Sequence, residues 1–85
     1  MKLLFTRTFV RDYRKLPRDI QKLTDKHLEL LLSDSRHPSL NFKKVQDPRD
    51  IRECRVTTSY RFTLQIADDL YVLRKIGTHD LLRNP

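Results

Sequence analysis

Residues 54–66, Cys-Arg-Val-Thr-Thr-Ser-Tyr-Arg-Phe-Thr-Leu-Gln-Ile, decide the fold of this 85-residue chain. From residue 60 onward apolar and polar side chains alternate, which is the period of a β-strand with one buried face. The side chains expected in the core are Tyr60, Phe62, Leu64 and Ile66. Those expected on the open face are Arg61, Thr63 and Gln65. Thr57-Thr58-Ser59 is a turn signal, so the stretch predicts a β-hairpin.

The register of this hairpin brings two arginines side by side. A three-residue turn sets Arg55 opposite Arg61 and leaves Cys54 and Val56 on the core face. Like charges directly opposite each other destabilise a strand pair. Either a carboxylate such as Glu53 neutralises the pair, or a phosphate does, because the planar guanidinium fork matches phosphate oxygens. On geometry we favour the phosphate.

Two helices are expected before the hairpin. Residues 2–5 predict a short first strand, after which Thr6 or Thr8 can cap a helix. The buried side chains of that helix are expected to be Phe9, Tyr13 and Leu16. Pro17 ends this helix and suits the first turn of the next. The buried stripe of the second helix is expected to comprise Ile20, Leu23, His27, Leu30 and Leu31, widened by Leu28 and Leu32.

The rest of the chain completes a small α+β fold. Helical periodicity is lost from residue 33 to residue 48, which predicts a long loop that carries Lys43 and Lys44. Strands are expected at residues 51–56, 60–66 and 70–76, joined by tight turns. We therefore predict one domain over residues 1–85 with the order β-α-α-β-β-β. The helical hairpin packs on one face of a small, mainly antiparallel sheet.

The charge of the chain points to an anionic partner, and RNA is the expected one. Lys and Arg number 18 against 11 Asp and Glu, which gives a net charge of +7. A polyanion binds such a surface by releasing its counterions. Residues 36–61 hold seven basic and three acidic side chains, so we expect the anion there. Solubility, or binding of an acidic protein, is the alternative interpretation of the charge.

Composition argues against several other classes of protein. No apolar run reaches the roughly 20 residues that span a bilayer, and the N-terminal segment meets charge too early for a signal peptide. The single cysteine, Cys54, cannot form an internal disulfide, which fits the reducing cytoplasm. One cysteine and three scattered histidines do not have the spacing of a zinc site. We expect a cytoplasmic protein without a metal or cofactor.

A histidine follows the last predicted strand. Gly77, the only glycine, permits a bulge or a close backbone approach, and His79 comes just after it, near the arginine pair. A histidine titrates near neutral pH, so His79 is a candidate general acid or base, with Asp80 either orienting it or solvated. His27 and His37 are assigned structural roles. Arginine, lysine and histidine suffice for RNA cleavage without a metal.

Several motifs together resemble the RelE/ParE superfamily of toxin–antitoxin toxins. They are the Leu-Pro break at residues 16–17, the loop HPSLNFKKV at 37–45, the hairpin at 54–66 and the ending LRKIGTHD at 73–80. The resemblance covers nearly the whole chain and implies the same β-α-α-β-β-β fold. RelE-like members of the family are ribosome-dependent mRNA interferases. An antitoxin whose C-terminal segment wraps the toxin keeps each of them silent.

The resemblance also implies roles for individual residues. Arg61 resembles the family arginine that binds the scissile phosphate, and Arg55 resembles a basic residue on the preceding strand. His79 matches the catalytic histidine of the YafQ-like branch. Many members carry an aromatic residue four positions later, where this chain has Arg83. The residues expected to bind RNA are Lys43, Lys44, Arg52 and Arg83.

The predicted function is that of a type II toxin. We expect a metal-independent endoribonuclease that cleaves mRNA on the ribosome, inhibits translation and is blocked by an acidic antitoxin. Two alternatives stay open. A ParE-type toxin shares the fold but inhibits DNA gyrase without an RNase site, and a non-catalytic basic domain only binds RNA or an acidic partner.

Overall fold

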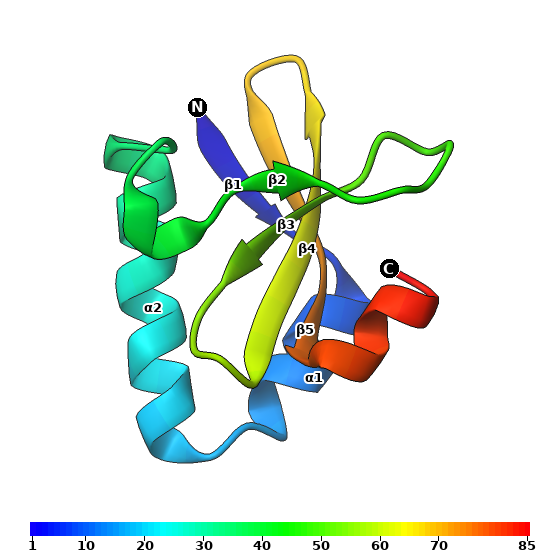
Figure 1. Cartoon of the computed structure of the whole chain (residues 1–85). Helices are drawn as coiled ribbons and strands as arrows, with labels where there is room; N and C mark the ends of the chain where they lie inside the picture. Colours follow the sequence, from blue (N-terminus) through cyan, green and yellow to red (C-terminus); the bar gives the residue numbers. More distant parts are fainter.

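The predicted hairpin lies at the centre of a five-stranded sheet in the computed structural model, which describes residues 1–85. The strands are β1 (Lys2–Phe5), β2 (Lys43–Lys44), β3 (Arg52–Arg55), β4 (Tyr60–Ala67) and β5 (Leu70–Thr78). Their order in the sheet is β1-β5-β4-β3-β2, and only the β1–β5 pair is parallel (Figure 1). The predicted α+β class and the mainly antiparallel sheet are confirmed.

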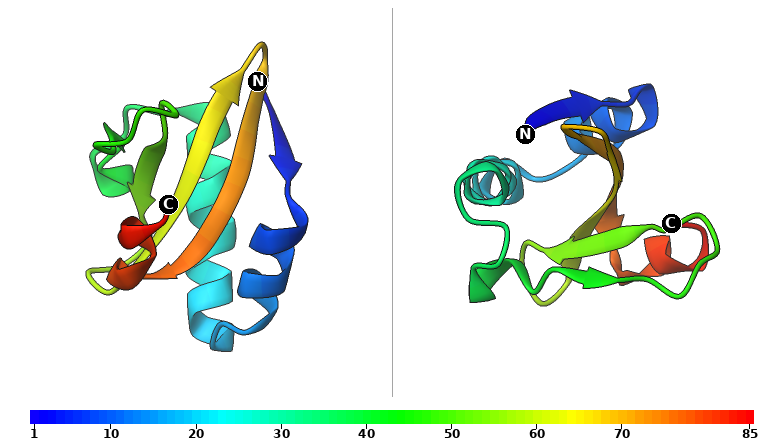
Figure 2. Two further views of the ribbon diagram at one scale, coloured as in Figure 1. Left: turned by 90° about the vertical axis from the view of Figure 1, so that its right-hand side faces the viewer. Right: turned by 90° about the horizontal axis from the view of Figure 1, so that it is seen from above.

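Two helices cover one face of this sheet, as predicted. They are α1 (Arg7–Arg14) and α2 (Arg18–Ser33). Thr6 is the N-cap of α1, and its Oγ1 accepts a hydrogen bond from the Phe9 amide at 3.2 Å. A short 3₁₀ helix, η2 (His79–Arg83), lies on the opposite face (Figure 2). None of the helices combines the length and the apolar character that crossing a membrane would require.

The core forms between the helices and the sheet. Its buried cluster comprises Phe9, Leu28, Leu31, Leu40, Cys54, Val56, Phe62, Leu64, Tyr71, Leu73 and Ile76. Phe9 of α1 meets Phe62 of β4 edge-on, with 6.4 Å between ring centroids. The predicted core positions Cys54, Val56, Phe62 and Leu64 are all buried. Strand alternation therefore identified the face of β4 that meets the helices.

The predicted stripe of α2 was partly wrong. The buried residues of this helix are Ile20, Thr24, Leu28 and Leu31. Leu23 and Leu32, which were expected inside, are exposed. Thr24 occupies the core instead, because its hydroxyl donates to the main-chain oxygen of Ile20 at 2.8 Å and so buries no unpaired polar group.

Ile66 also departs from the prediction, although its orientation was right. It pairs with the buried Tyr71 and so lies on the core face, yet 42% of it is exposed. Ile66 lies one residue before the end of β4, and the β4–β5 hairpin projects past the helices at the top of Figure 1. The helices that would cover this side chain do not reach it.

The segment predicted as a loop from residue 33 to residue 48 contains regular structure. A 3₁₀ helix, η1 (Pro38–Leu40), buries Leu40, and β2 pairs with β3. Two-residue strands and single helical turns are too short to leave a periodic signal in the sequence. The prediction of an irregular loop was therefore wrong for Lys43 and Lys44, which belong to β2.

Gly77 does not have the backbone role predicted for it. The irregularity in the β4–β5 pair falls between Thr63 and Leu64, where Arg74 is the extra residue of β5, while Gly77 pairs regularly with Arg61. No glycine has positive φ, and a Cβ at Gly77 would meet only the Leu81 side chain, at 3.7 Å. The strand also runs past its predicted end at Ile76, to Thr78.

Candidate functional site

Two rows of paired residues form the open face of the sheet, opposite α1 and α2. Directly paired residues point to the same side of a sheet. The lysine row is Lys43, Glu53, Thr63 and Lys75, one from each strand from β2 to β5. The arginine row is Arg55, Arg61 and Gly77, from β3 to β5. The predicted pairing of Arg55 with Arg61 is confirmed, and Gly77 adds no side chain beside Arg61.

Glu53 is the only acidic side chain in the two rows. Its Oε1 accepts a hydrogen bond from Arg61 Nη1 at 3.0 Å and forms an ion pair with Lys43 Nζ at 3.5 Å. The Glu53 side chain is 4% exposed and that of Arg61 is 11% exposed. The alternative that a carboxylate neutralises the arginines is therefore correct for Arg61.

Arg55 is not neutralised by any carboxylate. It takes part in no salt bridge, and its Nε is buried without a hydrogen-bond partner, as is the Nε of Arg61. Its backbone is held by α2, because His27 Nδ1 donates to the main-chain oxygen of Arg55 at 2.7 Å. Lys43 and Arg61 thus share one carboxylate while Arg55 has none, and the site keeps excess positive charge.

The C-terminal segment covers part of the open face, which the sequence did not reveal. Thr63 Oγ1 donates to the main-chain oxygen of Pro85 at 2.9 Å, and Arg74 Nε donates to the same oxygen at 3.2 Å. Lys75 Nζ donates to the main-chain oxygen of Asn84 at 2.6 Å. Thr63 is consequently fully buried, although it was expected on an uncovered surface.

His79 lies at the end of the arginine row. It is the first residue of η2 and follows Thr78, which pairs with Tyr60 next to Arg61. The side chain is exposed and makes no hydrogen bond or ion pair, so it is open to a ligand. Asp80 is also exposed and does not bond to His79, which supports the solvated interpretation of Asp80.

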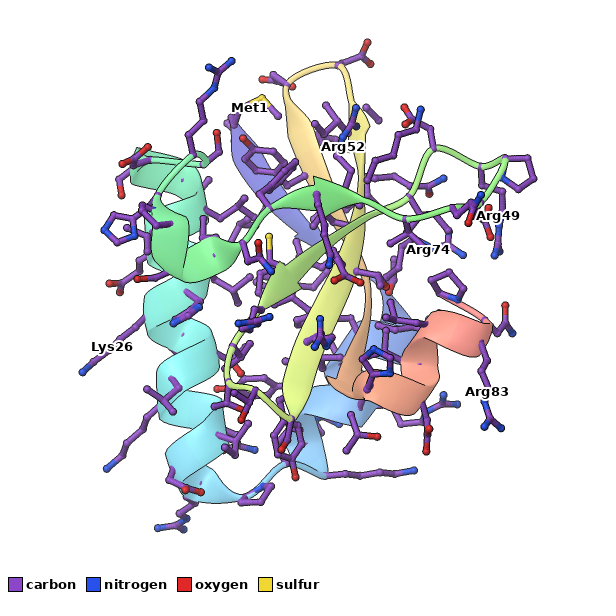
Figure 3. All side chains as sticks on the ribbon, in the orientation of Figure 1. Met1, Lys26, Arg49, Arg52, Arg74 and Arg83 are labelled. Atoms are coloured by element: carbon purple, nitrogen blue, oxygen red, sulfur yellow. The ribbon has the colours of Figure 1, made fainter.

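Three of the predicted RNA-binding residues lie apart from the arginine pair. Lys44 pairs with Arg52 across β2 and β3, so both point to the opposite side of the sheet from Lys43. Both also contact Asp50, Lys44 at 3.4 Å and Arg52 at 3.7 Å. Figure 3 shows Arg52 toward the β4–β5 hairpin and Arg83 pointing outward from η2. Lys43 alone of the predicted RNA-binding residues joins Arg55 and Arg61.

Four groups have displaced pKa values, Tyr13, Asp47, Arg49 and Cys54, and none of them belongs to the lysine row or the arginine row. Burial, followed by the charge of Glu53, raises the pKa of the Cys54 thiol to about 12, so the thiol stays protonated at neutral pH. Hydrogen bonds from Arg49 lower the pKa of Asp47 to about 2. The Asp47–Arg49 pair shapes the turn before β3, and Gln65 Nε2 ties that turn to β4 by donating to the Arg49 main-chain oxygen at 2.8 Å.

The fold is similar to several solved structures. YafQ from E. coli superposes with a TM-score of 0.77 at 14% identity over 94% of each chain. The YoeB/ParE toxin from Agrobacterium tumefaciens gives 0.78 at 13% identity over 93% of this chain and 99% of that one. The RelB–RelE antitoxin–toxin complex from Methanococcus jannaschii gives 0.75 at 23% identity over 95% of each chain.

This chain has the RelE/ParE toxin fold. The resemblance inferred from the sequence motifs is thus confirmed at the level of the fold. No protein-family model matches the sequence, and no curated protein is significantly similar to it. On this fold, Arg55, Arg61 and His79 lie at the end of the sheet where β3 and β5 finish, and Lys43 lies in the neighbouring row.

Proposed function

We propose that this protein is the toxin of a type II toxin–antitoxin system and acts in the cytoplasm as a metal-independent endoribonuclease on mRNA at the ribosome. The observation that supports this most is the cross-strand pair of Arg55 and Arg61 on the open face. A directly opposed pair of like charges is costly. Arg55 has no carboxylate partner, and the phosphate group of an RNA would be an anionic partner for its guanidinium.

The chemistry follows from the groups on this face. The ribose 2′-hydroxyl attacks the adjacent phosphorus and releases its proton to solvent, and the bond to the 5′-oxygen breaks. Arg55 and Arg61 hold the negative charge that grows on the phosphate, with Lys43 beside them. His79 donates a proton to the departing 5′-oxygen. The products are a 2′,3′-cyclic phosphate and a 5′-hydroxyl.

The proposed protein partner is an acidic antitoxin. RelE of M. jannaschii has been solved in complex with its antitoxin RelB. A net charge of +7 favours a partner segment rich in Asp and Glu that also carries apolar anchors. Such a segment neutralises the open face and competes there with RNA.

Cell-free translation of a reporter mRNA tests the nuclease. The wild-type protein should cut the message during translation, and cleavage sites should be mapped by primer extension. Arg61→Ala should lower the cleavage rate roughly 10²–10³-fold, and His79→Ala roughly 10²–10⁴-fold. Lys26→Ala, on the outer side of α2 (Figure 3), should cut normally. Circular dichroism and retained antitoxin binding show that each variant is folded.

The same samples separate the alternatives. A gyrase supercoiling assay is run beside the cleavage assay. Inhibition of supercoiling without RNA cleavage would favour a ParE-type toxin. RNA binding without cleavage and without inhibition of supercoiling would favour the non-catalytic RNA-binding domain. If His79→Ala alone keeps full activity, the proton donor is a different group.

A further inference from the structure

The position of Glu53 is unusual for an acidic residue in so basic a protein. It lies in the middle of the lysine row, paired with Lys43 on one side and Thr63 on the other. Arg61 is two residues from Thr63 on β4, so it is the diagonal neighbour of Glu53. One carboxylate oxygen, Oε1, contacts both Arg61 and Lys43. Cations from β2 and β4 therefore converge on one atom of β3.

Burying the Glu53 carboxylate costs free energy of folding unless its charge is well paired. An isolated buried carboxylate is strongly disfavoured, and paired buried charges bring specificity of geometry more than stability. Arginine side chains lose considerable conformational freedom when they are held in one rotamer. The contact with Glu53 holds the Arg61 guanidinium in place before any ligand arrives.

The contact also leaves Arg61 free to bind an anion. Nη1 is the only guanidinium nitrogen of Arg61 that donates to Glu53. Nη2 of Arg61 makes no hydrogen bond, whereas the Nε atoms of Arg61 and of its paired residue Arg55 are buried and unpaired. A guanidinium that is fixed by one outer nitrogen can still present the other, here Nη2, to a phosphate. Glu53 thus holds Arg61 without occupying all of its donors.

We propose that Glu53 is a positioning residue of the nuclease: through Oε1 it sets the Arg61 guanidinium and the Lys43 ammonium in the geometry that the scissile phosphate needs. This inference rests on the proposed function. Glu53 acts through Arg61 and Lys43. Its own side chain is 4% exposed, which leaves little surface for direct contact with RNA.

The proposal predicts opposite effects on binding and on cleavage. Lys43, Arg55 and Arg61 carry three positive charges against the single negative charge of Glu53. Glu53→Gln removes that negative charge with little change in shape, so RNA should bind more tightly. Cleavage should nevertheless slow, roughly 10²-fold, because Arg61 is no longer held in place. A purely structural role would weaken binding and cleavage together.

The experiment compares Glu53→Gln with Glu29→Gln, which makes the same charge change on the exposed side of α2. Binding of a single-stranded RNA oligonucleotide is measured by fluorescence anisotropy at several salt concentrations. Single-turnover cleavage of reporter mRNA is measured in cell-free translation. Glu53→Gln should bind RNA at least as tightly as wild type and cut it far more slowly. Glu29→Gln should match wild type in cleavage.

Two further variants keep the test decisive. Glu53→Asp keeps the charge but shortens the side chain, so cleavage should fall without a gain in RNA affinity. In an Arg61→Lys background, Glu53→Gln should slow RNA cleavage by a much smaller factor than it does in the wild-type protein. Both changes affect the same contact, so their effects should not add. Fully additive losses would contradict a role through Arg61.

The outcomes distinguish this inference from the proposed function. If the wild-type protein does not cut RNA, both the proposed nuclease function and the proposed role of Glu53 are wrong. If wild type cuts and Glu53→Gln cuts equally well, only the role of Glu53 fails. Loss of the folded state in both Glu53→Gln and Glu53→Asp would assign Glu53 a structural role and overturn the proposal.

Discussion

The helix-covered face and the open face of the sheet are both buried at their centres, but by different means. On the helix side Phe62 and Cys54 are fully buried among apolar neighbours. On the open side Glu53 and Thr63 are almost as deeply buried, and each depends on named polar partners. Apolar burial is non-directional, whereas a buried polar group is stable only when its hydrogen bonds are made. The open face is therefore the one where single atoms matter.

The largest expected effect is on the helix side. Phe62→Ala should lower the free energy of unfolding by about 3–5 kcal/mol, because it removes a fully buried ring that packs on Phe9. Ile66→Ala is the matched control, since Ile66 lies on the same face of β4 but is exposed. Urea denaturation measures both. Equal shifts in the two midpoints would contradict the assigned limits of the core.

The next effect belongs to the open face and concerns activity. Arg55→Ala should reduce mRNA cleavage roughly 10²–10³-fold, because it removes one of the two guanidinium groups proposed to hold the phosphate. The free energy of unfolding should change little, since Arg55 makes no salt bridge and its removal relieves repulsion with Arg61. Lys44→Ala, on the other side of the sheet, should have a much smaller effect in the same assay. A larger loss for Lys44→Ala would reverse the assignment of the faces.

A smaller effect tests how the open face is covered. Thr63→Val keeps the shape of the side chain but removes the hydroxyl that donates to Pro85. The loss should be about 1 kcal/mol in the free energy of unfolding, because the Pro85 oxygen keeps its bond from Arg74. Thr58→Val, at an exposed turn position, is the control. A more stable Thr63→Val protein would mean that the contact with Pro85 contributes nothing.

The smallest effect is expected beside Arg61. Gly77→Ala should be neutral or should stabilise the protein by about 0.4–1 kcal/mol, because it limits the unfolded chain and meets only Leu81. Thermal unfolding followed by circular dichroism measures this, with cleavage assayed in parallel. A loss of more than about 1 kcal/mol would show that the strand requires glycine there after all.

Alternation and spacing in the sequence determined much of the architecture. The strict period of residues 60–66 identified β4, its core face and the pairing of Arg55 with Arg61, because side chains of a strand alternate between faces whatever surrounds them. Helical spacing located α1 and α2 but misjudged Leu23 and Leu32, since a leucine-rich helix has more apolar positions than its neighbours can cover. The two residues of β2 were too few to produce a period.

Only the tertiary structure decided how the site is assembled. The sequence nominated four RNA-binding residues, but the register of β2 against β3 turned Lys43 toward Arg61 and Lys44 away from it. The covering of Thr63 by the segment that ends at Pro85, and the convergence of Lys43 and Arg61 on Glu53, join residues distant in the chain. Local patterns report which face a side chain occupies. Which partners it meets there depends on strand order and register, which are set by packing of the whole domain.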